Sequence, residues 1–247
     1  MRGDFLNCSF FYKFNSEKLR LNKYVQENLG ISRRAFVDLV SNWQVFLDWE
    51  KIDSIGFEVK WWEMLVINKL NIKKKILISN SLEIVLFNKP MWYVCSKSDK
   101  HNKTIYEILP KEFSSYFYIW RLDKDSRGLL ILTNNSWLVN KFQHPSNNVE
   151  KEYIVQIDRL FSQNDFKKVK KWIIDEWELL SVKTLKYYEQ KNKYFVKIIL
   201  WEWKKRHIRR IMKSLWYKVI DLVRVREWQF ELWNLREGNF KQLRINN

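Results

Sequence analysis

A short loop rich in charged side chains offers the clearest candidate for chemistry. It reads Arg121-Leu122-Asp123-Lys124-Asp125-Ser126-Arg127-Gly128 and stands just before Leu129–Leu132, an apolar run typical of a buried strand. An ionised carboxylate in such a loop can act as a nucleophile or accept a proton. From these residues alone, an ordinary solvated turn is the commoner explanation.

The overall charge indicates a polyanionic partner. The 247 residues include 45 Lys plus Arg against 28 Asp plus Glu, which gives a formal net charge of +17. Four basic runs are candidates for phosphate contacts, which give affinity but little sequence choice. They are Arg33-Arg34, Lys73–Lys75, Lys167–Lys171 and Lys204–Arg210.

The composition excludes several classes of protein. With 46% hydrophobic residues the chain has material for a core, so general disorder is excluded. Its apolar runs fall far short of the roughly 20 residues of a membrane span, and its N-terminus is a poor secretory signal. Cys8 and Cys95 make no disulfide framework, and His101 and His144 lack companion ligands at metal spacing. We expect a soluble, cytoplasmic protein without a metal.

Tryptophan is abundant where glycine is scarce. The chain has 14 Trp and 5 Gly, whereas an average glycine content of about 7% corresponds to about 17 glycines. Asp48-Trp49 stands where Asp-Gly forms a hairpin turn, Trp137 ends a turn cluster, and Trp216 follows a helix at a C-cap position. We hypothesise that most of these Trp are glycine in the living cell, through a UGA codon translated under the wrong code.

The N-terminal part reads as a small unit of helices and strands. Residues 21–29 have the apolar spacing of a helix that Gly30 ends, and Ser32 can cap a second helix. The residues expected to point inward from that second helix are Phe36, Val37 and Val40. A strand at Val45–Leu47 follows, and Lys73–Lys75 marks a polar join to the rest of the chain.

Beyond the join, strands outnumber helices. We expect strands over residues 83–88, 129–133, 151–155, 194–200, 218–226 and 230–235, and helices over 166–172 and 206–215. Since strands and helices do not alternate strictly, the pattern predicts an α+β fold with a mixed or antiparallel sheet.

Several motifs occur in a fixed order. They are Asn88-Lys89-Pro90-Met91-Trp92, Trp120-Arg121-Leu122-Asp123, Glu150-Lys151-Glu152-Tyr153 and Glu202–Arg210, with Val219, Leu222 and Arg224 beyond them. This set resembles the motifs of bacterial rRNA pseudouridine synthases, the family of RsuA, RluB, RluE and RluF. The segment from residue 21 to 49 resembles an RNA-binding module shared with a small-subunit ribosomal protein. The resemblance covers about residues 17–245.

The resemblance implies two modules after a variable segment. Residues 16–78 would form the ribosomal-protein-like RNA-binding module, and residues 79–247 the catalytic domain, with 1–15 as a variable N-terminal segment. The implied fold is α+β: a small N-terminal α/β module, then a mixed, largely antiparallel sheet flanked by helices.

The resemblance also implies a role for each site residue, and no cofactor. Asp123 would be the catalytic carboxylate, Arg209 would pair with it, and Tyr153 would stack on the uracil and assist a proton transfer. Substrate-binding residues would be Arg121, Leu222, Lys204, Arg206 and Arg210. Asp125, the other carboxylate of the loop, is expected from its position alone to be a solvated turn residue. In the RNA-binding module the contacts would come from Lys23, Arg33 and Arg34.

Twelve tryptophans stand where the family pattern has glycine, and restoring them gives an ordinary glycine content. They are Trp43, Trp49, Trp62, Trp92, Trp120, Trp137, Trp172, Trp177, Trp203, Trp216, Trp228 and Trp233. Trp61 and Trp201 stay unassigned. His207 is a milder departure, since the family usually has Gln there.

The implied function is the isomerisation of a uridine to pseudouridine in ribosomal RNA by a monomer. Segments near Asp123 look closest to RluF and residues 230–243 to RluB, which favours large-subunit rRNA. Three alternatives stay open: a small-subunit (RsuA-like) synthase, a tRNA synthase, and a non-catalytic RNA-binding assembly factor.

Overall fold

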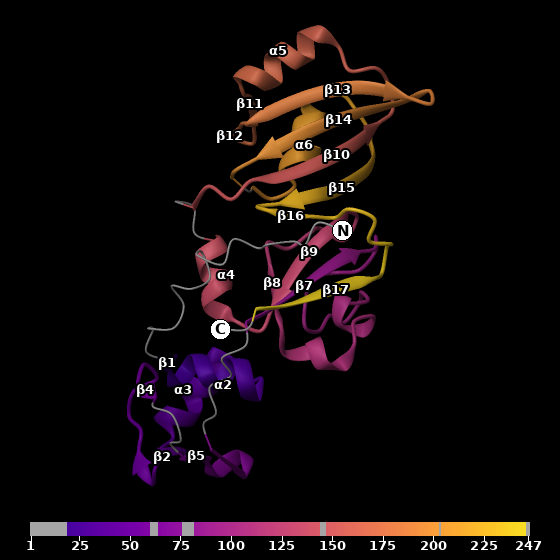
Figure 1. The fold of residues 1–247 in the computed structure, drawn as a ribbon. Helices are drawn as coiled ribbons and strands as arrows, with labels where there is room; N and C mark the ends of the chain where they lie inside the picture. Colours follow the sequence, from indigo (N-terminus) through magenta and orange to yellow (C-terminus); the bar gives the residue numbers. More distant parts are fainter. Residues whose placement is uncertain (1–18, 60–63, 76–81, 144–146, 203, 246–247) are drawn as a thin grey trace. The chain divides into compact units, whose positions relative to one another are not determined.

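The computed structural model describes residues 19–59, 64–75, 82–143, 147–202 and 204–245 (Figure 1). The chain divides into two compact units, Met1–Leu82 with Arg244–Asn247, and Glu83–Leu243. The expected junction at residues 78 and 79 lies outside the described residues. No helix among the described residues is long and apolar enough to span a bilayer.

The N-terminal unit contains two short helices and small antiparallel sheets. Helix α2 (Leu21–Leu29) ends at Gly30, whose φ of 68° is left-handed, and Ser32 caps α3 (Arg33–Ser41) by accepting a hydrogen bond from the Ala35 amide. Both expectations are confirmed. The sheet strands, in spatial order, are β3 (Glu50–Lys51), β2 (Val45–Leu47), β5 (Met64–Ile67) and β6 (Ile72–Lys75). The other elements of the unit are the pair β1 (Leu19–Arg20) and β4 (Glu58–Val59), and the 3-10 turn η1 (Asn68–Leu70).

Two details of the N-terminal unit differ from the sequence analysis. Val37 is 36% exposed, and Leu39 instead lies in the core beside Phe36 and Val40, because the helix turns its buried stripe by a fraction of a turn. Lys73–Lys75 is not a polar join: it belongs to β6, which pairs antiparallel with β5.

A nine-stranded mixed sheet forms the centre of the second unit. Its main order is β13-β14-β10-β15-β9-β7-β17, with β8 and β16 paired to β9 and β15. The bounds are β7 (Leu82–Lys89), β8 (Phe117–Ile119), β9 (Arg127–Thr133), β10 (Lys151–Ile157), β13 (Thr184–Gln190), β14 (Lys193–Leu200), β15 (Val219–Glu227), β16 (Phe230–Glu231) and β17 (Phe240–Ile245). The β9–β15 pair is parallel, whereas β10 runs antiparallel to both of its neighbours. The expected α+β fold is confirmed.

Helices and a hairpin complete this unit. They are α4 (Ser136–Gln143), α5 (Gln163–Lys171), α6 (His207–Ser214), the 3-10 turns η2 (Ile105–Glu107) and η3 (Lys111–Ser115), and the hairpin β11 (Ile173–Asp175) with β12 (Glu178–Leu180). Ile208, Ile211 and Met212 of α6 share one core cluster with Val155 and Val196 of the sheet. Helix α6 therefore covers the sheet face to which the odd-numbered residues of β10 point.

Some strands of the second unit differ from those expected from the sequence. Residues 230–235 form only the two-residue β16, and β13 and β17 were not expected. Strand β13 contains Lys186, Glu189 and Gln190 on an exposed sheet edge, so it lacks the apolar pattern by which strands are found.

Glycine is required where β9 meets β15. Gly128 has a φ of 105°, and a Cβ atom there would lie 2.3 Å from the carbonyl oxygen of Arg224. Since Arg224 is the cross-strand partner of Gly128, any side chain would force the two strands apart.

Tryptophans occupy left-handed backbone positions to an unusual degree. Fifteen described residues other than glycine have a positive φ, and eight of these are Trp, with φ between 43° and 72°. They are Trp43, Trp49, Trp92, Trp120, Trp177, Trp216, Trp228 and Trp233. Bulky side chains rarely adopt this conformation, which costs about 1–2 kcal/mol.

The remaining four of the twelve positions behave differently. Trp62 and Trp203 lie outside the described residues. Trp172 has a φ of 169°, which is extended backbone. The backbone of Trp137 lies in α4, so the left-handed turn expected there is wrong: the helix begins one residue earlier, at Ser136.

A substitution at Trp177 tests the cost of these conformations. Trp177 is 100% exposed at a φ of 65°, so its replacement by glycine removes backbone strain without removing packing. We expect Trp177→Gly to raise the free energy of unfolding by about 1 kcal/mol. The relief of backbone strain stabilises the folded state, and the greater conformational freedom of glycine in the unfolded chain offsets part of this gain. Urea denaturation followed by circular dichroism measures this change. Trp172→Gly, at an extended position, should give no gain; a similar gain there would contradict the explanation.

Candidate active site

The loop between β8 and β9 presents Asp123 at a partly exposed position. Leu122 is 1% exposed and fixes the loop to the core. The Ser126 amide donates to the Asp123 carbonyl at 3.1 Å, and the Trp92 amide donates to the Lys124 carbonyl at 2.7 Å. The loop is therefore held in one conformation, with the Asp123 side chain left accessible at its turn.

A buried lysine lies beneath this loop. The Lys89 ammonium donates to the carbonyl oxygens of Ser126, at 2.7 Å, and Pro90, at 2.9 Å. Burial lowers its pKa to about 8, while the carboxylates of Asp125 and Asp123 act in the opposite direction. Lys89 was noticed only as part of a motif, and the sequence alone gave no sign that it contacts the loop.

Arg209 lies against the loop but pairs with the other carboxylate. Its Nε is 3.3 Å from Asp125 Oδ2, and its Nη2 donates to the Asp125 carbonyl at 2.7 Å. Arg206 Nη2 is 2.9 Å from the same Asp125 oxygen. These cations hold the pKa of Asp125 below its usual range against the opposing effect of burial. The expected Arg209–Asp123 pair is thus replaced by an Arg209–Asp125 pair, and Asp125 is a loop anchor rather than a solvated turn residue.

A cluster of ionisable side chains is buried behind the loop. Tyr153, Arg224, Glu227 and Lys151 each have 0% exposure. Arg224 Nη2 is 3.1 Å from Glu227 Oε2, and Arg224 Nε donates to the Leu129 carbonyl at 2.7 Å. Burial raises the pKa of Glu227, and the cations of Arg224 and Lys151 oppose this shift. We call these four residues the buried charge cluster; all come from β10 and β15, neighbours in the sheet.

Tyr153 connects the cluster with the loop. Desolvation raises the pKa of its hydroxyl to about 12, and the positive charge of Arg224 and the negative charge of Asp123 both act on it. Leu222, 3% exposed, lies on the same face of β15 as Arg224. Asp123, Tyr153 and Leu222 are therefore brought to one region, as expected, although Tyr153 is more deeply buried than a stacking residue needs to be.

Trp120, which directly precedes Arg121, covers part of the buried charge cluster. The Lys151 ammonium lies 3.6 Å from the ring centroid of Trp120, and Trp120 Nε1 donates to the Phe142 carbonyl at 3.0 Å. A cation over an aromatic face is attracted by the ring electrons. With glycine at position 120, Lys151 would lose this contact.

Three expected substrate-binding residues have structural partners instead, and one of them is Arg206, which pairs with Asp125. Arg210 Nε lies 2.5 Å from Asp175 Oδ2, and Arg210 also pairs with Glu178, so it ties α6 to the β11–β12 hairpin. Lys204 donates to the Leu179 carbonyl. Since these side chains are used within the protein, they are poorly placed to contact substrate.

The other expected residues differ in exposure. Arg121 is exposed at the start of the loop, as are Arg33 and Arg34 in the first turn of α3, while Lys23 in α2 is partly buried. His207 is fully buried, and this burial lowers its pKa to about 4, so it is neutral at pH 7.

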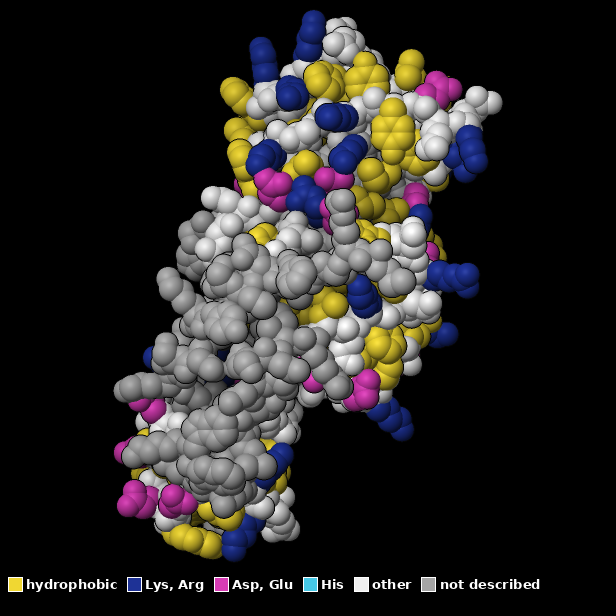
Figure 2. All heavy atoms as spheres, viewed as in Figure 1, with side chains coloured by type: hydrophobic (Ala, Val, Ile, Leu, Met, Phe, Trp, Pro, Cys, Tyr) yellow, Lys and Arg dark blue, Asp and Glu magenta, His cyan; other side chains and the backbone are white. Residues whose placement is uncertain are grey.

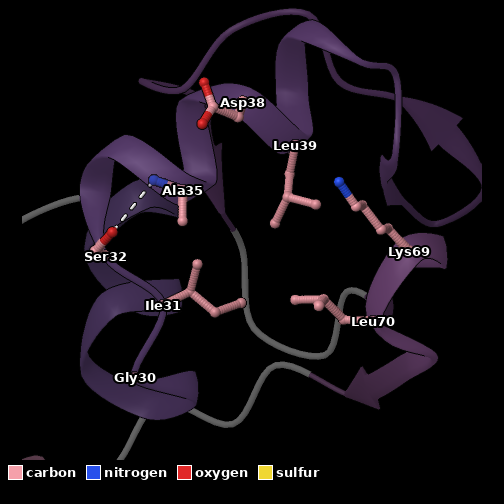
Figure 3. Close-up of a pocket in the computed structure, with 8 residues that line it drawn as sticks. All are labelled: Gly30, Ile31, Ser32, Ala35, Asp38, Leu39, Lys69 and Leu70. Carbon is pink, nitrogen blue, oxygen red and sulfur yellow. Dashed lines mark hydrogen bonds between the residues drawn. The ribbon is translucent and has the colours of Figure 1, made fainter.

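A pocket of about 520 Å³ lies in the N-terminal unit (Figure 3). Ile31, Leu39 and Leu70 supply apolar walls, while Asp38 and Lys69 carry the charged groups. Figure 3 shows the Ser32–Ala35 cap of α3 on one side and Lys69 on the other. The pocket belongs to the N-terminal unit, whereas Asp123 belongs to the other unit.

Comparisons with known proteins agree with the geometry of the second unit. Residues 83–214 match the family described as RNA pseudouridylate synthase. The chain is 34% identical to ribosomal large subunit pseudouridine synthase B of Buchnera aphidicola subsp. Baizongia pistaciae (strain Bp), covering 78% of this chain and 80% of that protein. It is 30% identical to dual-specificity RNA pseudouridine synthase RluF of Escherichia coli (strain K12), covering 91% and 75%.

A solved structure shows the same fold. A crystal structure of a pseudouridylate synthase superposes with a TM-score of 0.62 at 23% identity and covers 91% of this chain and 96% of that one. Together, the matched residues 83–214 and the extent of the relatives show that the chain belongs to the RNA pseudouridylate synthase family.

Proposed function

We propose that this protein isomerises a uridine to pseudouridine in ribosomal RNA, with Asp123 as the catalytic carboxylate. The observation that carries the proposal is the position of Asp123, on a loop that accepts hydrogen bonds from buried Lys89 and from Arg209 of α6, where its charge acts on buried Tyr153. A fixed, accessible carboxylate suits a reaction in which positioning supplies much of the rate.

The reaction needs no redox partner. The bond between the uracil nitrogen and the ribose carbon breaks, the uracil turns, and a bond forms from a ring carbon to the same ribose carbon. That ring carbon gives up its proton and the freed ring nitrogen takes one up, so the product is an isomer of the substrate. Asp123 can attack the ribose carbon or remove a ribose proton, and an ionised carboxylate suits either role. Arg121, exposed beside it, is placed to hold the flipped nucleotide by its phosphate.

We infer a narrower role than stacking for Tyr153. Its ring is fully buried, so it reaches a uracil only if the loop above it moves. Its raised pKa keeps the hydroxyl protonated at neutral pH, which suits a proton donor or a positioning group. We infer that Leu222 forms an apolar wall beside it.

The target is inferred from the relatives. One has a name specifying the ribosomal large subunit, and the RluF relative is named as dual-specificity. From the first of these names we infer large-subunit rRNA as the target, acted on in the cytoplasm. We infer a monomer, because the candidate residues all come from one unit of one chain. We infer that residues 16–78 bind RNA through Lys23 and the exposed Arg33 and Arg34 at the start of α3.

Tritium release from ring-labelled uridine tests this function. Unmodified large-subunit rRNA, small-subunit rRNA and tRNA are offered separately to the full chain, and release is expected only from the first. Release from small-subunit rRNA or tRNA alone would overturn the target. No release from any of the three by the folded protein would leave a non-catalytic RNA-binding protein as the explanation.

We further propose that the tryptophans at positions such as 120 and 177 are glycines in the natural protein. Eight of them have backbone conformations that glycine adopts freely, and all eight stand where the family pattern has glycine. Peptide sequencing of natively produced protein across residues 112–141 is expected to give glycine at 120 and 137. Tryptophan at both positions would contradict the recoding.

A further inference from the structure

The central sheet has a second face that is not the face of the candidate active site. Along β10, Tyr153, Val155 and Ile157 are buried, whereas Ile154 and Gln156 between them are partly exposed. Strand β14 repeats the pattern, since Val196 and Ile198 join the core cluster with α6. In Figure 1, α6 lies behind the strands, so the view is onto the partly exposed face.

The strand pairing aligns specific side chains on that face. Between β13 and β14 the successive cross-strand partners are Gln190 with Lys193, Tyr188 with Phe195, Lys186 with Lys197, and Thr184 with Ile199. Alternate residues of paired strands point to one face, so all eight share the face that does not carry Val196 and Ile198. We call Lys186, Tyr188, Lys193, Phe195 and Lys197 the open-face patch.

The aromatic pair of the patch leaves one ring surface available. The rings of Tyr188 and Phe195 are stacked, with centroids 5.4 Å apart and planes 18° apart. Tyr188 is 40% exposed and belongs to β13, the edge strand of the sheet. One side of its ring therefore contacts Phe195, and the other side faces the free edge.

The lysines of the patch are arranged at a cost to stability. Lys186 stands directly opposite Lys197, and like charges at paired positions destabilise a sheet. Glu152 compensates one of them, with its Oε1 2.5 Å from Lys197 Nζ. Figure 2 shows dark-blue Lys and Arg side chains interspersed with yellow hydrophobic ones over this part of the molecule. Such an arrangement suits a polyanion with flat apolar groups.

We propose that the open-face patch binds single-stranded RNA, with a base stacked on Tyr188 and phosphates held by Lys186, Lys193 and Lys197. Exposed aromatic rings among lysines on a sheet are the surface on which unpaired bases stack. The proposal rests on RNA being the substrate and identifies a second contact for it. Because Tyr153 points to the opposite face, this contact is separate from the catalytic residues.

Binding of a labelled single-stranded oligouridine to the full chain tests the patch, using fluorescence anisotropy. Tyr188→Ala is expected to weaken binding about 5- to 100-fold, while Tyr188→Phe, which keeps the stacking surface, should bind like the wild type. Lys186→Ala is expected to reduce the slope of log affinity against log salt concentration by about 1, which corresponds to the loss of one phosphate contact. Lys111→Ala, an exposed lysine on η3, is the matched control and should change neither.

Photocrosslinking with 5-iodouridine in the same oligonucleotide gives a direct readout. Crosslinks are expected in the peptides that contain Tyr188 or Phe195. Crosslinks only elsewhere, together with unchanged affinity of Tyr188→Ala, would overturn the patch while leaving tritium release from rRNA intact. Loss of the proposed function has a different signature: no tritium release by the wild type, whatever its affinity for the oligonucleotide.

Discussion

Replacing Asp123 by Asn is expected to lower pseudouridine formation at least about 10³-fold, because an amide neither attacks the ribose carbon nor accepts a proton from it. The change is nearly isosteric, and Asp123 is partly exposed, so the fold should persist. Single-turnover tritium release from rRNA measures the rate, and circular dichroism confirms that the variant is folded.

Two other acidic positions make the Asp123 result specific. Glu112→Gln, on the exposed surface of η3, should retain wild-type activity. Asp125→Asn should lose part of the activity, since its carboxylate is held by Arg206 and Arg209 and the loop would be less well fixed. If Asp125→Asn were inactive while Asp123→Asn kept its rate, the catalytic assignment would move to Asp125.

Replacing Glu227 by Gln is expected to lower the free energy of unfolding by about 3–5 kcal/mol. Glu227 is the acidic member of the buried charge cluster, 3.1 Å from Arg224 and close to Lys151. A neutral amide at this position leaves two fully buried cations without a counter-charge. Urea denaturation monitored by circular dichroism gives the difference, with Glu112→Gln as an exposed control.

A double variant separates charge balance from simple loss of packing. Arg224→Met combined with Glu227→Leu removes the ion pair and keeps the volume apolar, so it should recover much of the stability lost in Glu227→Gln. A Glu227→Gln protein with wild-type stability would show that the cluster is not held together by charge.

The sequence predicted the N-terminal helices well because their signals are local. Gly30 and Ser32 act within one turn of the backbone, and the structure has both as expected. The hairpin turn expected at Asp48-Trp49 is also present between β2 and β3, and both residues have the positive φ of such a turn. Strand β13 could not be found, because an exposed edge strand lacks an apolar period.

The sequence predicted that Asp123, Tyr153 and Leu222 lie in one region, but it did not predict the ion-pair partners of the neighbouring charged residues. Asp123, Tyr153 and Leu222 do converge, but the partner of Arg209 is decided by a difference of two residues in the loop, below what spacing can resolve. Glu227 and Lys89 were missed as site neighbours because a charged residue in a strand normally indicates exposure. Only the register of β10 and β15 shows that Glu227 faces Lys151.

The anchors of the Asp123 loop also determine when the site can form. The hydrogen bond from Arg209 to Asp125 spans 84 residues, and the one from Arg224 to Leu129 spans 95. During synthesis the loop leaves the ribosome after Lys89 and Trp92 but well before α6 and β15, so the nascent chain carries Asp123 without the contacts from Arg209 and Arg224. Contacts of such long range also make folding slow. The Asp123 loop therefore reaches its final set of contacts only after α6 and β15 have been made.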